Sequence, residues 1–198
     1  NKIFKFEKQY RKYKRPHLGF QLDYLDNKQL TPSIFFYFSR DRVETKARQA
    51  TTNRKKIKEA EEVRKLFNNV FDSLDSVEYE LLNLDELLWM WVRGVGYHHA
   101  GLAPIVKEFI EYLFLNRFIK YLFATETLSL GLNLPAKSIV IDRLYKFDGV
   151  KTRLINQSEF LQLTGRAGRR GIDTKGFAFI NYDRNIENFW YNNLFTLK

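Results

Sequence analysis

The sequence predicts one α/β domain of three layers, in which helices cover both faces of a mostly parallel sheet. Two continuous apolar runs, residues 119–124 and 138–141, have the length of strands and lack the alternation of a half-exposed strand. Segments with helical spacing separate such runs, and strands that alternate with helices are typical of a parallel sheet. With 198 residues, of which 44% are hydrophobic, the chain is long enough for one domain with a substantial core.

The amino-terminal part is expected to be an entry segment that precedes this domain. Residues 1–15 carry seven basic side chains and one acidic one, interleaved with aromatic residues. Such a tail could lie against nucleic acid, but a linker from a preceding domain fits it better. We therefore assign residues 1–30 to the entry segment and residues 31–198 to the domain. The chain does not begin with Met, which indicates a piece of a longer protein.

Three elements are expected in the first half of the domain. Residues 33–39 form an aromatic run of strand length. Residues 42–71 carry apolar side chains at helical spacing and predict one or two helices. Residues 81–92 predict another helix, and its Trp89 and Trp91 are expected in the core because large indole rings are usually buried.

The second half of the domain continues the alternation. Residues 104–115 predict a helix with Pro104 in its first turn, where the missing N–H costs nothing. After the apolar runs given above, residues 159–163 predict a short helix and residues 177–181 a last strand. Residues 185–194 predict a terminal helix.

Composition favours a polyanionic partner and gives no support to a disulfide-stabilised, metal-binding, membrane-spanning or secreted protein. The net charge is +10 and the sequence pI about 9.6. The chain has no cysteine and three histidines, two of them adjacent, so neither a disulfide framework nor a metal site is expected. No apolar run approaches the length of a membrane span and no secretory leader is present, so an intracellular protein is expected.

A glycine- and arginine-rich stretch carries the strongest chemical signal. Residues 162–171 read Gln-Leu-Thr-Gly-Arg-Ala-Gly-Arg-Arg-Gly. Arginine suits a multiply charged phosphate because its guanidinium stays charged and donates several hydrogen bonds in a fixed fork. Arg166 and Arg169 are three residues apart and share a face in a helical turn. Gly165 and Gly168 leave room for close approach. A solvated basic loop would not need this glycine spacing.

A second stretch lies about forty residues upstream. Residues 125–135 read Thr-Glu-Thr-Leu-Ser-Leu-Gly-Leu-Asn-Leu-Pro and follow a predicted buried strand. The pattern indicates a strand, then a turn rich in hydroxyl groups, then a Gly-x-Asn-x-Pro loop.

Taken together, these stretches make the chain resemble the second RecA-like domain of superfamily-two helicases. Residues 125–135 are similar to motif V of that superfamily, and residues 162–170 to its motif VI. The most similar branch is the superkiller-type DExH-box class of RNA helicases, because residues 94–102 (Gly-Val-Gly-Tyr-His-His-Ala-Gly-Leu) are similar to its motif IVa and residues 33–40 to motif IV. Residues 145–149 (Tyr-Lys-Phe-Asp-Gly) are similar to the RNA-acting members in particular.

The resemblance implies a three-layer RecA-like fold and a role in ATP hydrolysis. ATP would lie between two RecA-like domains, with Mg²⁺ and most phosphate contacts supplied by the first. Gln162 would orient the attacking water or contact the γ-phosphate, while Arg166 and Arg169 would stabilise the transition state as arginine fingers. Gly131 and Asn133 would contact the ribose.

The resemblance also implies contacts with the sugar–phosphate backbone of single-stranded RNA that carries a 3′ tail. The residues expected to make these contacts are Ser39, Arg40, His98, His99, Gly101, Thr125 and Glu126. For His98 and His99, direct RNA contact and structural hydrogen bonding are equally open.

The chain lacks parts that the family's activity requires. It has neither a Gly-x-x-x-x-Gly-Lys-Ser/Thr loop nor an Asp-Glu-x-His stretch, so it is not expected to hydrolyse ATP alone. The resemblance implies that a first RecA-like domain precedes it, that winged-helix and helical domains follow it, and that an RNA-degradation complex is a possible partner.

Two alternatives stay open. The chain could belong to a non-catalytic module that only binds RNA or docks a partner, although Gln162, Arg166 and Arg169 are all present. It could also belong to a DNA-repair helicase of the same superfamily, which shares motifs V and VI.

Overall fold

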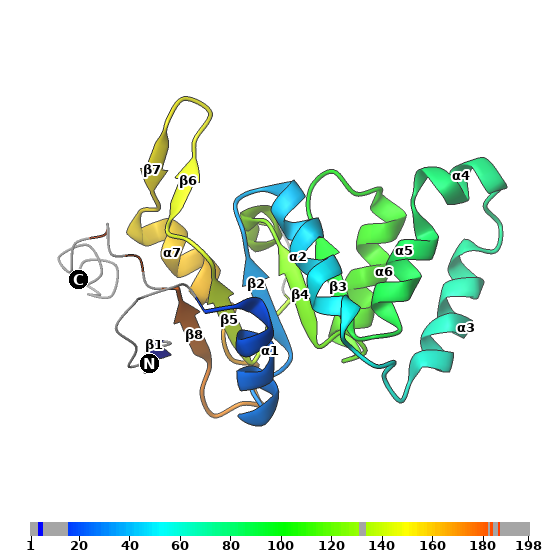
Figure 1. Cartoon of the computed structure of the whole chain (residues 1–198), viewed down its shortest axis with the longest axis horizontal. Coiled ribbons are helices and arrows are strands. Elements are labelled where there is room, and N and C mark those ends of the chain that lie inside the picture. Colours follow the sequence, from blue (N-terminus) through cyan, green and yellow to red (C-terminus); the bar gives the residue numbers. More distant parts are fainter. Residues whose placement is uncertain (1–3, 6–15, 131–133, 182, 184–185, 187–198) are drawn as a thin grey trace.

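The central feature of the computed structural model is a parallel sheet. The structure describes residues 4–5, 16–130, 134–181, 183 and 186. Within these residues, the main sheet has six strands in the order β1-β8-β5-β2-β4-β3, and every pairing is parallel (Figure 1). The strands are β1 (Phe4–Lys5), β2 (Ser33–Phe36), β3 (Val95–His98), β4 (Tyr121–Ala124), β5 (Ser138–Ile141) and β8 (Phe177–Ile180).

Five of these strands begin and end level with one another. Their last residues form a row across the sheet: His98, Ala124, Phe36, Ile141 and Ile180. We call the residues just beyond this row the carboxyl edge. Their first residues form the opposite row, Val95, Tyr121, Ser33, Ser138 and Phe177, and the residues just before it are the amino edge. Segments distant in the chain are thereby brought side by side at each edge.

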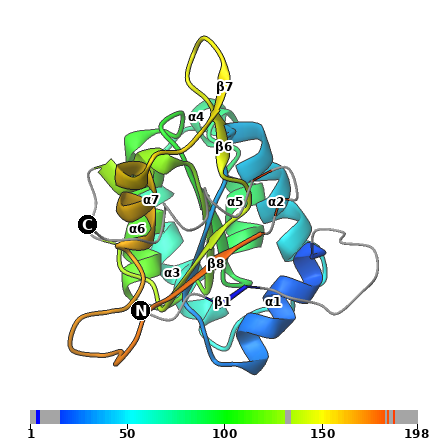
Figure 2. The same cartoon turned by 90° about the vertical axis from the view of Figure 1, so that its left-hand side faces the viewer.

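Helices flank the sheet on both faces. Figure 2 shows α1 (Leu18–Asn27) and α2 (Arg40–Thr52) on one side, and α6 (Pro104–Leu115) and α7 (Gln157–Thr164) on the other. Beyond the edge strand β3 lie α3 (Ala60–Phe71), α4 (Ser76–Leu81) and α5 (Leu84–Trp91) (Figure 1). A short 3₁₀ helix, η1 (Glu126–Leu130), follows β4. The domain therefore has the three layers that the alternating pattern predicts.

The core is unusually aromatic. In the sheet, Phe35 of β2 stacks on Phe123 of β4 with 4.9 Å between ring centroids. Beyond β3, the indole of Trp91 is fully buried and lies 5.1 Å from the ring of Phe109 and 6.3 Å from that of Phe71. Such pairs add stabilisation beyond the area that they bury. This second cluster joins α3 and α5 to α6.

Most of the predicted elements are present. The helix at 104–115 has the expected bounds, and the strands expected at 33–39, 119–124, 138–141 and 177–181 are β2, β4, β5 and β8. Trp91 is in the core, as expected, and Trp89 is partly buried against it.

The segment 42–71, where one or two helices were expected, forms two, because a loop over residues 53–59 separates α2 from α3. Other details differ from the expectations. The helix expected at 81–92 begins at Leu84, since Asn83 has a φ of 51° and interrupts the helical backbone after α4. Strand β3 was not predicted because it is short and contains a glycine and a histidine. The helix predicted at 185–194 lies outside the described residues.

Two further elements fall in segments without a predicted structure. Helix α1 lies in the predicted entry segment, yet its Leu22 and Leu25 are buried in the core, so this part of the segment is packed on the domain. An antiparallel hairpin, β6 (Tyr145–Phe147) and β7 (Thr152–Leu154), projects from the carboxyl edge (Figures 1 and 2). Its turn needs Gly149, whose φ is 100°.

We expect Trp91→Ala to lower the free energy of unfolding by about 3–5 kcal/mol, the usual cost of truncating a buried aromatic side chain. The matched control is Trp89→Ala, because Trp89 is only partly buried and its ring faces the guanidinium of Arg93 at 5.4 Å. Urea denaturation followed by circular dichroism measures both losses. Equal losses for the two variants would show that the cluster around Trp91 does not hold α3 and α5 in place.

Candidate functional site

All the residues proposed for RNA contact lie at or next to the carboxyl edge. They follow three adjacent strands: β2 leads to Ser39 and Arg40, β4 to Thr125 and Glu126, and β3 ends at His98. His99 and Gly101 continue directly from β3. The sheet topology therefore joins three separate sequence stretches into one surface, because parallel strands deliver their following loops to the same edge.

The loop after β3 packs closely against the start of α2. Ser39 is the N-cap of α2, and its hydroxyl accepts a hydrogen bond from the backbone N–H of Arg42. The space around Gly101 is tight, since an added Cβ would lie 3.0 Å from Nη1 of Arg40 and 3.1 Å from Nδ1 of His99. Arg40 and Gly101 are thus neighbours, as a shared backbone-binding surface requires.

Both adjacent histidines are buried and bonded within the protein. Nε2 of His98 lies 2.7 Å from Oε1 of Glu111, and burial lowers the pKa of His98. His99 accepts a hydrogen bond from the N–H of Gly101 at Nδ1, and its Nε2 lies 3.0 Å from Oε1 of Glu44. These bonds fix the shape of the loop. Contact between these imidazoles and RNA stays a prediction.

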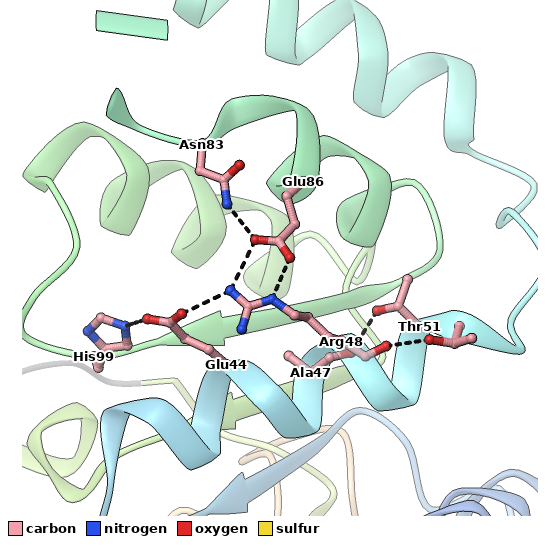
Figure 3. Close-up of polar contacts among 8 residues, drawn as sticks. Glu44, Ala47, Arg48, Thr51, Asn83, Glu86 and His99 are labelled. Atoms are coloured by element: carbon pink, nitrogen blue, oxygen red, sulfur yellow. Dashed lines mark hydrogen bonds and ion pairs between the residues drawn. The ribbon is translucent and has the colours of Figure 1, made fainter. Parts of the chain in front are cut away.

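The bond from His99 continues into a longer network (Figure 3). Glu44 accepts a hydrogen bond from Nη2 of Arg48 at 3.0 Å. Arg48 also forms a two-pronged ion pair with Glu86 of α5, which in turn accepts a bond from the amide of Asn83. The loop after β3 is therefore connected through α2 to the helices beyond the edge strand.

The first residues of motif V are hydrogen-bonded to the end of β3 at the carboxyl edge. The N–H of Thr125 donates to the carbonyl of His98, and its buried hydroxyl lies 2.8 Å from that of Thr127. The carboxylate of Glu126 lies 3.8 Å from Nζ of Lys146 in the hairpin.

An ion cluster connects the hairpin to the start of α7. Glu159 accepts bonds from both terminal nitrogens of Arg153 at 2.8 Å, and its Oε1 lies 2.7 Å from Nζ of Lys146. The Arg153 guanidinium and the Lys146 ammonium hold the pKa of Glu159 well below its usual range. Since Lys146 also faces Glu126, this cluster joins motif V to the helix that carries motif VI.

The motif VI residues lie away from the RNA surface, towards the amino edge. Gln162 is exposed on α7, and Arg166 and Arg169 are half-buried in the turns that follow it. Arg169 forms a two-pronged ion pair with Asp173, with Nε–Oδ2 and Nη2–Oδ1 distances of 2.7 and 2.8 Å. This pair raises the pKa of Arg169 and lowers that of Asp173. The guanidinium of Arg169 is therefore held in one orientation.

Backbone contacts attach the motif VI turn to the sheet. Ala136, just before β5, donates to the carbonyl of Arg166 at 3.0 Å and accepts from the N–H of Gly168 at 2.7 Å. Gly168 has a φ of 94°. A Cβ on Gly176 would lie 2.2 Å from the carbonyl carbon of Ala167, so only glycine fits there. Motif VI thus depends on a glycine outside it.

The predicted site residues therefore form two sets on one sheet. The RNA set is at the carboxyl edge, and Gln162, Arg166 and Arg169 lie towards the amino edge. Gly131 and Asn133 lie outside the described residues. Sequence reasoning missed Asp173, Gly176 and the carboxylate partners of the two histidines. Of these, only Asp173 had a visible signal, because it stands four residues after Arg169.

The described residues contain neither a metal-binding cluster nor a helix that could span a membrane. No three histidine or carboxylate side chains in this part of the chain are close enough together to hold a metal ion. None of the helices that the structure describes combines the length and the apolar character needed to cross a membrane.

We expect Gly176→Ala to displace the motif VI turn and to destabilise the protein by about 1–3 kcal/mol, because an overpacked site must shift its backbone. The matched control is Gly19→Ala in α1, where the nearest atom to an added Cβ is 3.5 Å away. There, alanine should be neutral or stabilising. Urea denaturation distinguishes the two. An unaltered unfolding midpoint in Gly176→Ala would contradict the close contact described here.

Comparisons with known proteins show the family to which the chain is similar. The family described as "Helicase conserved C-terminal domain" matches residues 67–171. The chain is 42% identical over 163 residues to "DExH-box ATP-dependent RNA helicase DExH9" of Arabidopsis thaliana, covering 81% of the chain and 16% of that protein. It is 40% identical over 156 residues to "Exosome RNA helicase MTR4" of Homo sapiens (78% and 15%). It is 38% identical over 160 residues to "Antiviral helicase SKI2" of Saccharomyces cerevisiae (80% and 12%).

These relatives confirm the resemblance to the superkiller-type class. The chain spans about a sixth or less of the length of each.

Proposed function

Because the chain belongs to the helicase conserved C-terminal domain family, in its superkiller-type DExH class, we propose that it is the second motor domain of an ATP-dependent 3′–5′ RNA helicase. It supplies arginine fingers for ATP hydrolysis and grips the RNA backbone. The separation of its site residues between two parts of one sheet supports this proposal most directly, because a motor must hold its strand and its nucleotide at different places.

The motif VI turn fits a γ-phosphate. Asp173 occupies Nε and one proton of Nη2 on Arg169, so both protons of Nη1 and the second proton of Nη2 remain available for a phosphate. Asp173 then acts as a positioning residue that holds the finger in one orientation. Arg166 and the exposed Gln162 flank the same turn. When bound, ATP supplies the phosphoanhydride bond that is cleaved, and arginine fingers contribute on the order of 10³–10⁵ in rate.

The remaining nucleotide contacts come from elsewhere. Gly131 and Asn133 are proposed for the ribose. The described residues offer no acidic cluster for Mg²⁺, so a preceding RecA-like domain would hold it together with most of the phosphates. The domain alone would be inactive, since it has no P-loop sequence.

The carboxyl edge fits an RNA backbone. Its exposed Arg40 and the backbone amides of the neighbouring loops are the kind of donors that contact phosphates without reading bases. The chain's net charge of +10 supports the same role. We therefore expect weak sequence preference.

The ion cluster around Lys146 gives a route by which the two sets affect each other. Lys146 lies between Glu126, in the RNA set, and Glu159, at the start of the motif VI helix. A shift of either carboxylate changes the interaction of the other with the same ammonium group. Domain closure on ATP and opening after hydrolysis would then move the protein along one strand.

The wider assembly follows from the same proposal. Winged-helix and helical domains would complete the motor, and an RNA-degradation complex would be its partner, a role suggested by the exosome named for the human relative. A DNA-repair helicase and a non-catalytic module are the alternatives that the experiments below distinguish.

In the full-length protein, we expect Arg166→Ala or Arg169→Ala to reduce RNA-stimulated ATP turnover by about 10³-fold or more, with RNA affinity changed less than about twofold. Asp173→Asn should give a smaller loss of turnover, because Arg169 keeps its charge but loses its orientation. Arg64→Ala, on the surface of α3, is the control and should change neither. Turnover assays and RNA titrations measure both effects. A large loss of RNA affinity with normal turnover would reverse the assignment, and the absence of RNA-stimulated turnover in the unaltered protein would favour the non-catalytic module.

Thr125→Ala is expected to have the opposite effect, because Thr125 belongs to the RNA set. Its buried hydroxyl bonds Thr127 next to the end of β3, so its loss should weaken RNA binding and reduce the unwinding obtained for each ATP hydrolysed. Titration with labelled RNA and paired unwinding and turnover assays measure this. Normal binding with absent turnover would move Thr125 to the nucleotide set.

The intact protein should unwind RNA with a single-stranded 3′ extension faster than RNA with a 5′ extension or DNA with a 3′ extension. The RNA preference rests on the resemblance of residues 145–149 and requires contact with the 2′-hydroxyl. An unwinding assay on the three substrates tests it. Equal or faster unwinding of the DNA would favour the repair helicase.

A further inference from the structure

A large basic cavity lies at the amino edge, on the face covered by α1 and α2. It has a volume of about 1150 Å³, and eight lysine and arginine side chains line it against three carboxylates. Its walls come from α1, the end of α2, the loop over residues 53–59 and the residues just before β3 and β4. The motif VI turn approaches the amino edge beside β5 and β8 instead. The cavity is therefore separate from both parts of the proposed motor site.

The floor of the cavity is rigid. The guanidinium of Arg54 lies 4.3 Å from the ring centroid of Tyr121 and forms an ion pair with Asp26 at 3.0 Å. The carbonyl of Arg54 accepts a bond from Nε of Arg93, whose Nη1 is held by the carbonyl of Trp89. The start of the loop is therefore fixed to the sheet and to α5, and the lysines that follow it project from a defined position.

The lysines on the walls carry uncompensated charge. Lys55, Lys56, Lys58 and Lys120 are exposed, and none of the ion pairs found within the described residues involves them. Asp26 cannot neutralise them, because it is already bonded to Arg54 and to the hydroxyl of Tyr121. A concave site with this excess of one charge concentrates ligands of the opposite charge.

The other lining residues indicate which kind of anion fits. Among the described lining residues, the imidazole of His17 is the sole aromatic ring, and its Nδ1 already accepts a bond from the N–H of Gly19. Successive bases of single-stranded RNA would therefore find no row of stacking platforms there. Asp23 and Glu59 lie on its walls, where they could accept hydrogen bonds from the backbone N–H groups of a peptide, whereas phosphodiester groups offer no such donors. Leu22 and Ile57 add an apolar contribution.

From this combination, we propose that the cavity binds an acidic segment of a partner protein. The segment's carboxylates would pair with Lys55, Lys56, Lys58 and Lys120, while its backbone would run along Asp23 and Glu59. Binding would leave the carboxyl edge open to RNA, so a partner could be held on the domain while the motor works.

The test uses the full-length protein and a fluorescein-labelled deca-glutamate peptide, followed by fluorescence anisotropy at about 50 mM salt, where charge screening is weak. The double variant Lys56→Glu with Lys120→Glu should weaken peptide binding by about tenfold or more. The control, Lys28→Glu with Lys65→Glu, makes the same charge change at exposed positions outside the cavity. It should change binding less than about twofold. Lys56→Ala with Lys120→Ala gives a milder perturbation that should still weaken binding measurably.

A parallel titration with 3′-tailed RNA decides between the two classes of macromolecule. Unchanged RNA affinity in the cavity variants, together with lost peptide binding, supports the proposal. Equal losses of RNA and peptide affinity would make the cavity an RNA surface and overturn it. Equal peptide affinity in the cavity and control variants, or no peptide binding by the unaltered protein, would overturn it as well.

Discussion

The level register of the parallel strands is the constraint on which the rest of the structure depends. Strand β2 pairs residue for residue with β4 on one side and with β5 on the other, and β3 and β8 continue the same register. The hydrogen-bond ladder extends one residue further, since Tyr37 donates to Ala124 and Asp142 to Phe36. A slip of one residue would move every side chain of a strand to the opposite face of the sheet. Because the strands are in register, every loop that carries a proposed RNA contact begins at the same row of residues across the sheet.

The two sets of site residues are linked by groups that belong to neither. The hairpin contributes Lys146, which faces Glu126 and Glu159 together. A separate series of bonds attaches α1 and α2 to the ends of β5 and β8: Asn181 accepts a bond from Gln21 of α1 and donates to Asp142, which in turn pairs with Arg42 of α2. Buried or half-buried charges of this kind are costly unless every partner stays in place. They therefore favour a domain that moves as a rigid body, as a motor that closes and opens on a second domain would need.

The sequence predicted the strands best where burial is on both faces, because continuous apolar runs such as 138–141 have few other interpretations. It could not give the strand order, and it missed β3, in which Gly96 and His98 weaken the apolar pattern. For the candidate site, the motifs could be found from residue types and spacing alone. The partners could not, because Glu44 stands 55 residues before His99 in the chain. Such a contact exists only once the sheet has placed α2 beside β3.

The glycines of motif VI have a physical role that differs from the one their spacing predicts. Their spacing predicts room for close approach. In the structure, the space beside Gly168 is taken by the backbone of Gly176, and a Cβ on Gly165 would lie 2.8 Å from the carbonyl oxygen of Leu161. These glycines thus allow the chain to turn sharply and to lie flat against the sheet at Ala136. The arginines then gain their position from the packing of glycines, and Arg169 gains its orientation from Asp173. The motif VI turn, proposed to bind a phosphate, is therefore shaped by close packing of the backbone. The position of its arginines depends on contacts within the protein and not on contacts with a ligand.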